Sequence, residues 1–465
     1  MLDHPVIDAD GHLIELVPAA LPYLRESLGA KAFDRYRDAT ASLTSRLGSG
    51  VERWATRTPQ GGWWSSAVNK PRDLAAYVAP RLLHERLPEV GIDYSVLYPT
   101  LALATAGIGD DELRIGLCRG WNDYFAHTYG ACADRLTVVG LIPMATPEEA
   151  IAELDHCKAL GIKVVSTPHM VLRPIEKATP SPWRYPGQTH WCDFFTLDSA
   201  HDYDPVWERF RRHGYAVTIH VGVGAAPLGW YHWVSNFVAN HVGSFASACQ
   251  PRCKAFLLGG LTRRFPDLPV AFQECGASWA VTLLSDVIEH WEKRNTATMR
   301  KVFDPARHDA AVYRHWLETY ASDQLAAIDG DVDRALRATL LTGSPPPDFD
   351  EFAAVDVTSG DDLIERFVPH FWFGCEADDR TVMTAFANHN GIDRDLKVIL
   401  GSDIGHFDTP AMDDVVPQAM SLVERGLLTE SQLRALLFAN AHELFTAVNP
   451  DFFIGTVVSG RAITR

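Results

Sequence analysis

The stretch VIDADGH, from Val6 to His12, decides how the rest of this sequence is interpreted. Residues 5–8 form a short apolar run that predicts a buried strand, and the run leads directly to Asp10 and His12. Residues two apart in an extended chain face the same side, so these two side chains can hold one ion together. The segment is therefore the first candidate metal-binding element.

Seven further β-branched or aromatic runs follow, and longer stretches with helical periodicity lie between them. The predicted strands are 5–8, 94–98, 136–142, 162–166, 216–220, 270–274, 371–374 and 398–401. The clearest predicted helices, which open on acidic or capping residues or end at a glycine, are 147–160, 204–213 and 429–438. Strands that alternate with helices predict a parallel sheet, and eight of them predict an α/β fold of the (β/α)8 TIM-barrel type.

Three long segments do not fit the strand and helix repeat and are interpreted as insertions in a single barrel domain spanning residues 1–465. They are about 15–83, 171–204 and 294–364. The last contains two helical patterns, near 311–325 and 332–341, and indicates a helical cap or partner surface, with a separate domain as the alternative. The insertion 171–204 follows the fourth strand, where barrel loops overhang the active face.

Composition excludes several classes of function. The 42 Lys and Arg residues against 59 Asp and Glu give a formal charge of −17, which repels polyanions such as nucleic acid. The N-terminus lacks a basic and apolar leader, and no uncharged apolar run of about 18 residues occurs elsewhere. We therefore expect a cytoplasmic protein that binds a small-molecule substrate, neither nucleic acid nor membrane, and that forms a homo- or hetero-oligomer.

Ligand-type side chains also stand at the ends of three later strands, which in a barrel open into the same mouth. They are His220 after the fifth strand, Glu274 after the sixth and Asp403 after the eighth. A single histidine in such a place is more often structural, but the coincidence with Asp10 and His12 favours a shared site. Imidazole and carboxylate ligands together suit zinc, iron or manganese better than magnesium or calcium. One ion is expected, and two are an open alternative.

Three more residues, His406, His169 and Glu376, lie just beyond predicted strands and are secondary candidates for the metal or the substrate, or else solvated loop residues. Arg173 and Arg184 could pair with a substrate carboxylate or remain in solvent. Aromatic side chains in the overhanging segments indicate walls for a planar substrate, or else filling of the core. These tryptophans are Trp63, Trp64, Trp183, Trp191, Trp230 and Trp233.

Taken together, these segments resemble the amidohydrolase-related family that includes aminocarboxymuconate semialdehyde decarboxylase and hydroxybenzoate decarboxylases. The likeness spans most of the chain and is carried by VIDADGH, RLPEVGIDYSVLYPT, YDPVWERFRRHGYAVTIH, FQECGASW and VILGSDIGH. The resemblance implies a metal site made of Asp10, His12, His220 and Asp403. Many relatives have histidine where Asp10 stands, and the extra negative charge favours a harder metal or a second one.

The second departure is Glu274, which stands where the decarboxylases commonly have histidine. This residue could be a general acid or base, a further metal ligand, a bridge to a second ion, or an anchor that orients a ligand. The assignment of proton transfer in the relatives therefore does not pass directly to this chain.

The resemblance implies a divalent-metal enzyme, and the residues at the strand ends that we expect to be catalytic are Asp403, Glu274 and His220. Such an enzyme either hydrolyses a carbon–nitrogen or carbon–oxygen bond or removes CO2 non-oxidatively from a small carboxylate-bearing substrate. An iron-dependent oxygenase, or a subunit of one, is an alternative on the same barrel. A non-catalytic metal-binding partner subunit is a third, suggested by the long helical insertion.

Overall fold

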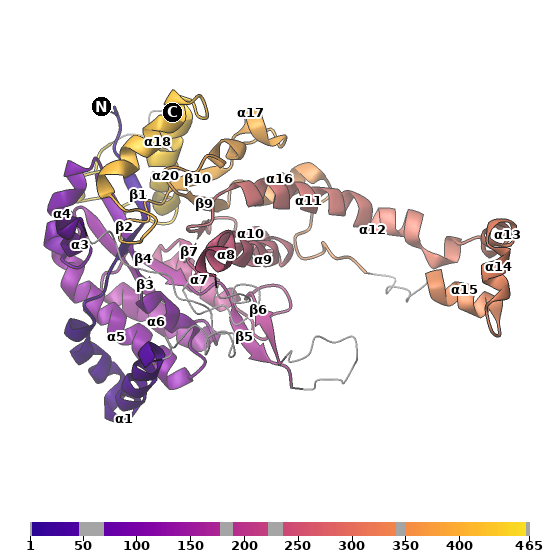
Figure 1. Cartoon of the computed structure of the whole chain (residues 1–465), viewed down its shortest axis with the longest axis horizontal. Helices are drawn as coiled ribbons and strands as arrows, with labels where there is room; N and C mark the ends of the chain where they lie inside the picture. The colour runs from indigo at the N-terminus through magenta and orange to yellow at the C-terminus, as the bar shows by residue number, and fades with distance from the viewer. Residues whose placement is uncertain (1, 46–68, 177–188, 222–235, 341–348, 462–465) are drawn as a thin grey trace.

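Eight parallel strands form a nearly closed barrel in the computed structural model, which describes residues 2–45, 69–176, 189–221, 236–340 and 349–461 (Figure 1). The predicted TIM barrel is confirmed, and its strands follow one another in chain order around the sheet. They are β1 (Ile7–Leu13), β2 (Tyr94–Pro99), β3 (Leu136–Leu141), β4 (Val164–Thr167), β7 (Val217–Ile219), β8 (Val270–Phe272), β9 (Phe371–Cys375) and β10 (Lys397–Leu400).

The prediction for the first strand was too short, because β1 continues through Leu13 instead of ending at residue 8. All seven of its residues are buried, and they pair with β2 on both sides of a register shift between Asp8 and Gly11. The polar residues of VIDADGH therefore lie inside the strand, although their composition is typical of a loop. By contrast, β7 and β8 end earlier than predicted, one residue before His220 and two residues before Glu274.

The barrel closes where the residues after β10 meet β1, and we call this junction the seam. The Asp403 backbone N–H donates to the Asp10 carbonyl at 2.9 Å, and the His12 N–H donates to the Ile404 carbonyl at 2.8 Å. Gly401 permits the approach, since an added Cβ would lie 3.0 Å from the Asp10 Cβ. Candidate ligands from the two ends of the chain are thus joined through the backbone itself.

The three predicted outer helices have the expected starts or stops. Helix α6 (Pro147–Ala159) begins after Thr146, whose side chain accepts from the Glu149 N–H, and α7 (Asp204–His213) ends at Gly214 with φ of 73°. The third begins as α19 (Glu430–Arg434), passes through a π-helical turn (Ala435–Ala439) and continues as α20 (Asn440–Thr446). The other main helices are α5 (Asp111–Tyr129), α9 (Ser244–Leu258), α11 (Ser278–Arg294), α16 (Gly360–Phe367) and α18 (Val415–Glu424).

Two of the insertions lie against the barrel. The first carries α1 (Val17–Ser45), α3 (Pro71–Ala76) and α4 (Pro80–Glu89), and α1 packs on α5. The insertion after β4 contains an antiparallel hairpin of β5 (Val171–Pro174) and β6 (His190–Asp193). Short helices α8 (Phe237–His241), α10 (Leu261–Arg264) and α17 (Ala387–Asn390) lie in later connections.

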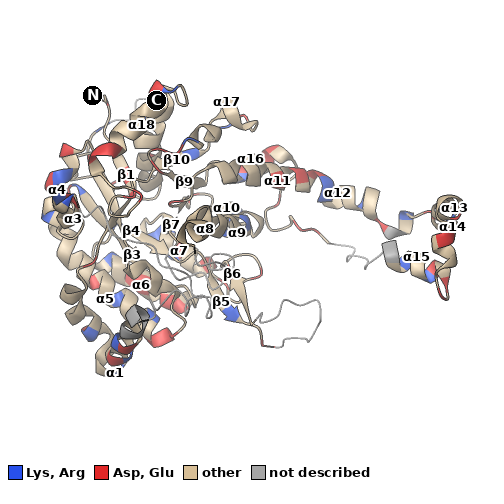
Figure 2. Cartoon of the chain, viewed as in Figure 1, with Lys and Arg blue, Asp and Glu red and all other residues tan. Residues whose placement is uncertain are grey.

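The third insertion forms a helical arm, residues 295–340, that extends away from the barrel (Figure 1). It carries α12 (Thr296–Thr298), α13 (Ala310–Tyr320), α14 (Ser322–Ala326) and α15 (Val332–Leu340). Both signs of charge occur along it (Figure 2), and Arg314 links two of its helices through Asp333 at 2.6 Å. The interpretation of one domain with insertions remains a prediction. None of the described helices combines the length and the apolar character that a membrane span requires.

Candidate metal centre

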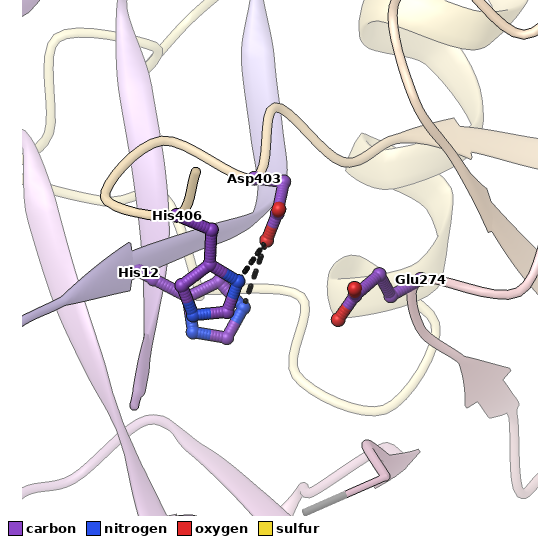
Figure 3. Close-up of side chains that lie close together, drawn as sticks. All are labelled: His12, Glu274, Asp403 and His406. Carbon is purple, nitrogen blue, oxygen red and sulfur yellow. Dashed lines mark ion pairs between the residues drawn. The ribbon is translucent and has the colours of Figure 1, made fainter. Parts of the chain in front are cut away.

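Five candidate ligands converge at the mouth of the barrel. Asp10 and His12 lie in β1, His220 directly follows β7, Glu274 follows β8, and Asp403 follows β10. Their side chains are almost fully buried, with exposed fractions between 0% and 3%. Figure 3 shows Glu274 facing His12 and Asp403 from the opposite side of the site.

The potential ligand atoms fall into two overlapping groups that share His12. One group contains Asp10, His12 and His220, and the other contains His12, Glu274, Asp403 and His406, with the atoms of each group within 4.8 Å of one another. The four ligands implied by the family resemblance are therefore divided between two groups that meet at His12. His406, a secondary candidate in the sequence, joins them.

The orientation of His220 is the feature most specific to a metal site. Its Nδ1 lies 3.2 Å from the Val221 carbonyl, which assigns the proton to Nδ1 and leaves a lone pair on Nε2. That Nε2 lies 3.1 Å from His12 Nε2, 3.2 Å from Glu274 Oε2 and 3.6 Å from Asp10 Oδ1. A lone pair cannot bond to carboxylate oxygens that also carry lone pairs, but a cation between these atoms satisfies all of them.

The carboxylates of the site also indicate that a cation binds here. Asp10 Oδ1 and Glu274 Oε2 accept no hydrogen bond from the described residues. Within those residues, no Lys or Arg forms an ion pair with Asp10, Glu274 or Asp403. Buried carboxylates without a compensating positive charge are costly, and metal coordination is a common solution. The donor set therefore fits a divalent cation that accepts both nitrogen and oxygen ligands.

His406 orients the end of the site next to the seam. Its Nδ1 lies 2.7 Å from Asp403 Oδ1, as the dashed line in Figure 3 marks, and its ring stacks on His12 at 3.7 Å between centroids. Its Nε2 lies 3.3 Å from Thr100 Oγ1. Because these contacts come from three strand ends, His406 fixes the positions of both Asp403 and His12.

Burial dominates the electrostatics of the isolated side chains. It lowers the pKa of His12 well below its usual value, also lowers that of His220, and lowers that of His406 to about 3. Burial likewise raises the pKa of Asp10, and it raises that of Asp403, where neighbouring carboxylates add to the effect. The histidines are therefore neutral, the form that binds metals, and a cation would favour the ionised form of the carboxylates.

Two of the carboxylates stand on unusual backbone. Glu274 has φ of 52° and Asp403 has φ of 51°, in the left-handed region that residues other than glycine seldom adopt. Such conformations cost free energy and occur preferentially where a side chain must be aimed at a site. Nothing in the sequence marks either position as left-handed.

Asp8 is a buried residue of the site that the sequence analysis missed. It is 0% exposed, and its Oδ2 accepts from Ser95 Oγ at 2.6 Å. Its Oδ1 accepts from the backbone N–H groups of Ser402 at 2.9 Å and Asp10 at 3.3 Å. Asp8 thus ties β1 to β2 and to the seam, and the alternation of Asp8 with Asp10 in VIDADGH was the available signal.

We expect Asp8→Asn to lower the free energy of unfolding by about 2–3 kcal/mol, because an amide nitrogen would replace one acceptor of a fully buried network. The displaced seam should also weaken metal affinity by about 10–100-fold. Urea unfolding and metal titration measure the two effects. Asp34→Asn, at an exposed position of α1, is the control. Equal unfolding curves for both variants would contradict the role given to Asp8.

The remaining secondary candidates lie outside the two groups of ligand atoms. His169 is 2% exposed beyond β4, and burial together with Arg252 lowers its pKa to about 4. Glu376 follows β9 and is partly buried, and burial next to Asp408 raises its pKa to about 7. Glu376 lines a pocket of about 330 Å³ beside the site, whose wall also includes His241, Phe245, Glu274 and Asp379.

The sequence-based candidates for substrate contact are only partly described. Arg173 forms an ion pair with Asp193 at 3.0 Å and donates to the Ala145 carbonyl at 2.7 Å, so its guanidinium is already used within the fold. Trp191 lies in β6. The other candidates lie outside the described residues: Arg184, Trp63, Trp64, Trp183, Trp230 and Trp233.

Comparison with protein families gives a match to the model described as Amidohydrolase over residues 7–326. A curated relative is the 2-amino-3-carboxymuconate-6-semialdehyde decarboxylase of Dictyostelium discoideum, 24% identical over 217 residues. That match covers 46% of this chain and 51% of the relative, so it spans about half the length of each.

Solved structures share the fold over nearly the whole chain. An amidohydrolase from Mycobacterium avium subsp. paratuberculosis K-10 has a TM-score of 0.56 and 16% identity, and the match covers 96% of this chain and 100% of the other. A dihydroxybenzoic acid decarboxylase from Polaromonas sp. JS666, with bound manganese and the inhibitor 2-nitroresorcinol, has a TM-score of 0.53 and 14% identity. That match covers 97% of this chain and 99% of the other.

Proposed function

Because the chain belongs to the amidohydrolase family, we propose that it is a divalent-metal enzyme that removes CO2 non-oxidatively from a small carboxylate-bearing substrate. The observation that carries the proposal is the lone pair of His220 Nε2, directed at His12 Nε2 and at two carboxylate oxygens. The choice of decarboxylation over hydrolysis is supported by the curated relative and the Polaromonas structure, both of which are named decarboxylases.

In this proposal Asp10, His12, His220 and Asp403 hold the principal ion. Two neutral imidazoles and two carboxylates give a neutral centre with a divalent cation, suited to manganese, zinc or iron(II). Manganese is the first choice to test, since the Polaromonas decarboxylase carries it. When bound, the ion would stabilise the negative charge that develops on the substrate during the reaction.

The side chains divide the remaining tasks. Glu274 borders the pocket and faces the other ligands, so its carboxylate can take up a proton from water and pass it to a substrate held between them. The bond between the substrate carbon and its carboxylate breaks, the electron pair stays on that carbon, and CO2 leaves. The carbon then takes that proton from Glu274, whose carboxylate is ionised again. His406 and Asp8 act as positioning residues for Asp403 and for the seam.

The test uses the full chain, stripped of metal by a chelator and then loaded with manganese, zinc or iron(II). Each form is incubated with a panel of small hydroxylated aromatic carboxylic acids and with aminocarboxymuconate semialdehyde, and CO2 release is measured with and without oxygen. We expect CO2 release from at least one substrate, only with metal, and equally under anaerobic conditions. Activity that is unchanged after complete metal removal would contradict the proposal.

The same assays separate the other reactions open to this site. Oxygen consumption in step with turnover would identify an oxygenase, and cleavage of amides or esters without CO2 release would identify a hydrolase. A metal-loaded chain that turns over substrate only when a second protein is added would identify a partner subunit.

A further inference from the structure

We propose that a second divalent cation binds beside the first, on the side of the pocket, held by His241, Glu274 and Asp408. Potential ligand atoms of these three residues lie within 4.8 Å of one another, although they come from α8, from the end of β8 and from the segment after β10. Glu274 also belongs to the group that contains His12 and Asp403, so its carboxylate is shared between the two sites. The inference deepens the proposed function and rests on it for the first ion.

The His241 ring is held in place by three aromatic side chains. Its centroid lies 5.0 Å from that of Phe237, 5.4 Å from that of Phe245 and 5.5 Å from that of Phe407. Phe245 also packs edge-on against His220, at 6.3 Å between centroids. An imidazole fixed in this way on a short helix, next to two carboxylates, is pre-arranged for a ligand rather than free to turn into solvent.

The site holds more carboxyl groups than one divalent cation can balance. The two positive charges of the first ion balance the negative charges of Asp10 and Asp403. The carboxylates of Glu274 and Asp408 are left without a balancing charge. The Glu274 side chain is 3% exposed, and neither its Oε2 nor Asp408 Oδ1 accepts a hydrogen bond from the part of the chain that the structure describes. Within that part no Lys or Arg ion pair reaches either residue. A second divalent cation balances these two charges in turn.

The donor set indicates which cation and which ligand this site takes. One imidazole nitrogen and two carboxylate oxygens suit manganese, zinc or iron(II), and three protein ligands leave positions open. His241 and Glu274 both line the 330 Å³ pocket, so the open positions face the space available to a substrate. The second cation would therefore bind a substrate through anionic oxygens, such as a carboxylate next to a hydroxyl group, with the two ions acting as a clamp.

The experiment measures how many ions the metal-free full chain binds. Manganese is titrated by equilibrium dialysis and counted by elemental analysis, and the spectrum of the loaded protein is recorded by electron paramagnetic resonance. We expect two ions per chain and the signal of two coupled manganese ions. Asp408→Asn and His241→Ala should each bind one ion and lose the coupling. Asp378→Asn, an exposed acid near Glu376, is the matched control and should keep both.

The outcomes separate the inference from the proposed function. No bound manganese, zinc or iron in the wild-type chain would overturn both. A wild-type chain that saturates at one ion without coupling would overturn the second site alone, and so would an Asp408→Asn variant that still binds two coupled ions. The wild-type measurement decides the question even if a variant fails to fold, which circular dichroism would reveal.

Discussion

Asp403→Asn is expected to abolish binding of the principal cation and to lower kcat/KM by at least about 10³-fold, while the chain remains folded. Asparagine keeps the shape of the side chain and its contact with His406, but it removes one of the two charges that balance the ion. Neutral amides are much weaker ligands than carboxylates for manganese, zinc or iron(II). Metal content after dialysis and kcat/KM with the best substrate of the panel are the measurements.

The backbone at this position calls for a matched control. Asp403 has φ of 51°, and Asp393, which is exposed, has φ of 58°. Asn tolerates the left-handed region as well as Asp does, so Asp393→Asn should leave metal content, activity and stability unchanged. Full metal content and full activity in Asp403→Asn would remove Asp403 from the site. Equal losses in both variants would point to a general effect on folding instead.

Glu274→Gln should lower kcat by about 10²–10⁴-fold while Asp10, His12 and His220 still retain the principal ion. Glutamine preserves the size and the hydrogen-bonding shape of the side chain, but it has no carboxyl proton to transfer. Because Glu274 is also placed in the second site, metal content should fall to one ion per chain. Steady-state kinetics and elemental analysis therefore give two separate readouts for one substitution.

A further measurement distinguishes proton transfer from simple metal loss. In D2O the wild-type enzyme should exchange the product hydrogen at the carbon that carried the carboxylate, since Glu274 can remove and return that proton. Glu274→Gln should lose the exchange even when excess manganese restores occupancy. His241→Ala, which leaves Glu274 intact, should retain part of it. A Glu274→Gln variant with the wild-type kcat would contradict the role in proton transfer and would leave Glu274 as a residue that orients His220.

The sequence was sufficient to predict the barrel because each strand is a compact apolar run bounded by polar, Gly or Pro residues. The boundaries were less predictable. Strand β1 continues through Asp10 and His12 because its bulge and its pairing with β2 bury polar residues that resemble a loop. The second half of the predicted helix 429–438 is a π-helical turn, Ala435–Ala439, which has no local signature in the sequence.

The candidate ligands were predictable for a geometric reason, since the carboxyl ends of parallel strands meet at one face of a barrel. Residues fixed by other contacts were not. His241 is placed at the site by the aromatic packing around α8, and Asp408 by a turn five residues beyond Asp403. Asp8 precedes the bulge, and its role in joining β1 to the seam depends on its hydrogen bond from the Ser402 N–H, which the sequence does not show.

The seam determines when the metal site can form during synthesis and folding. Asp10 and Asp403 are separated by most of the chain, yet the backbone bond between them is also the junction that sets two ligand positions. A nascent chain on the ribosome therefore cannot assemble this centre until its last strand has been made and has met its first. Fragments that stop before β10 would carry most of the barrel but would lack Asp403 and the seam, so we expect them to bind no principal ion.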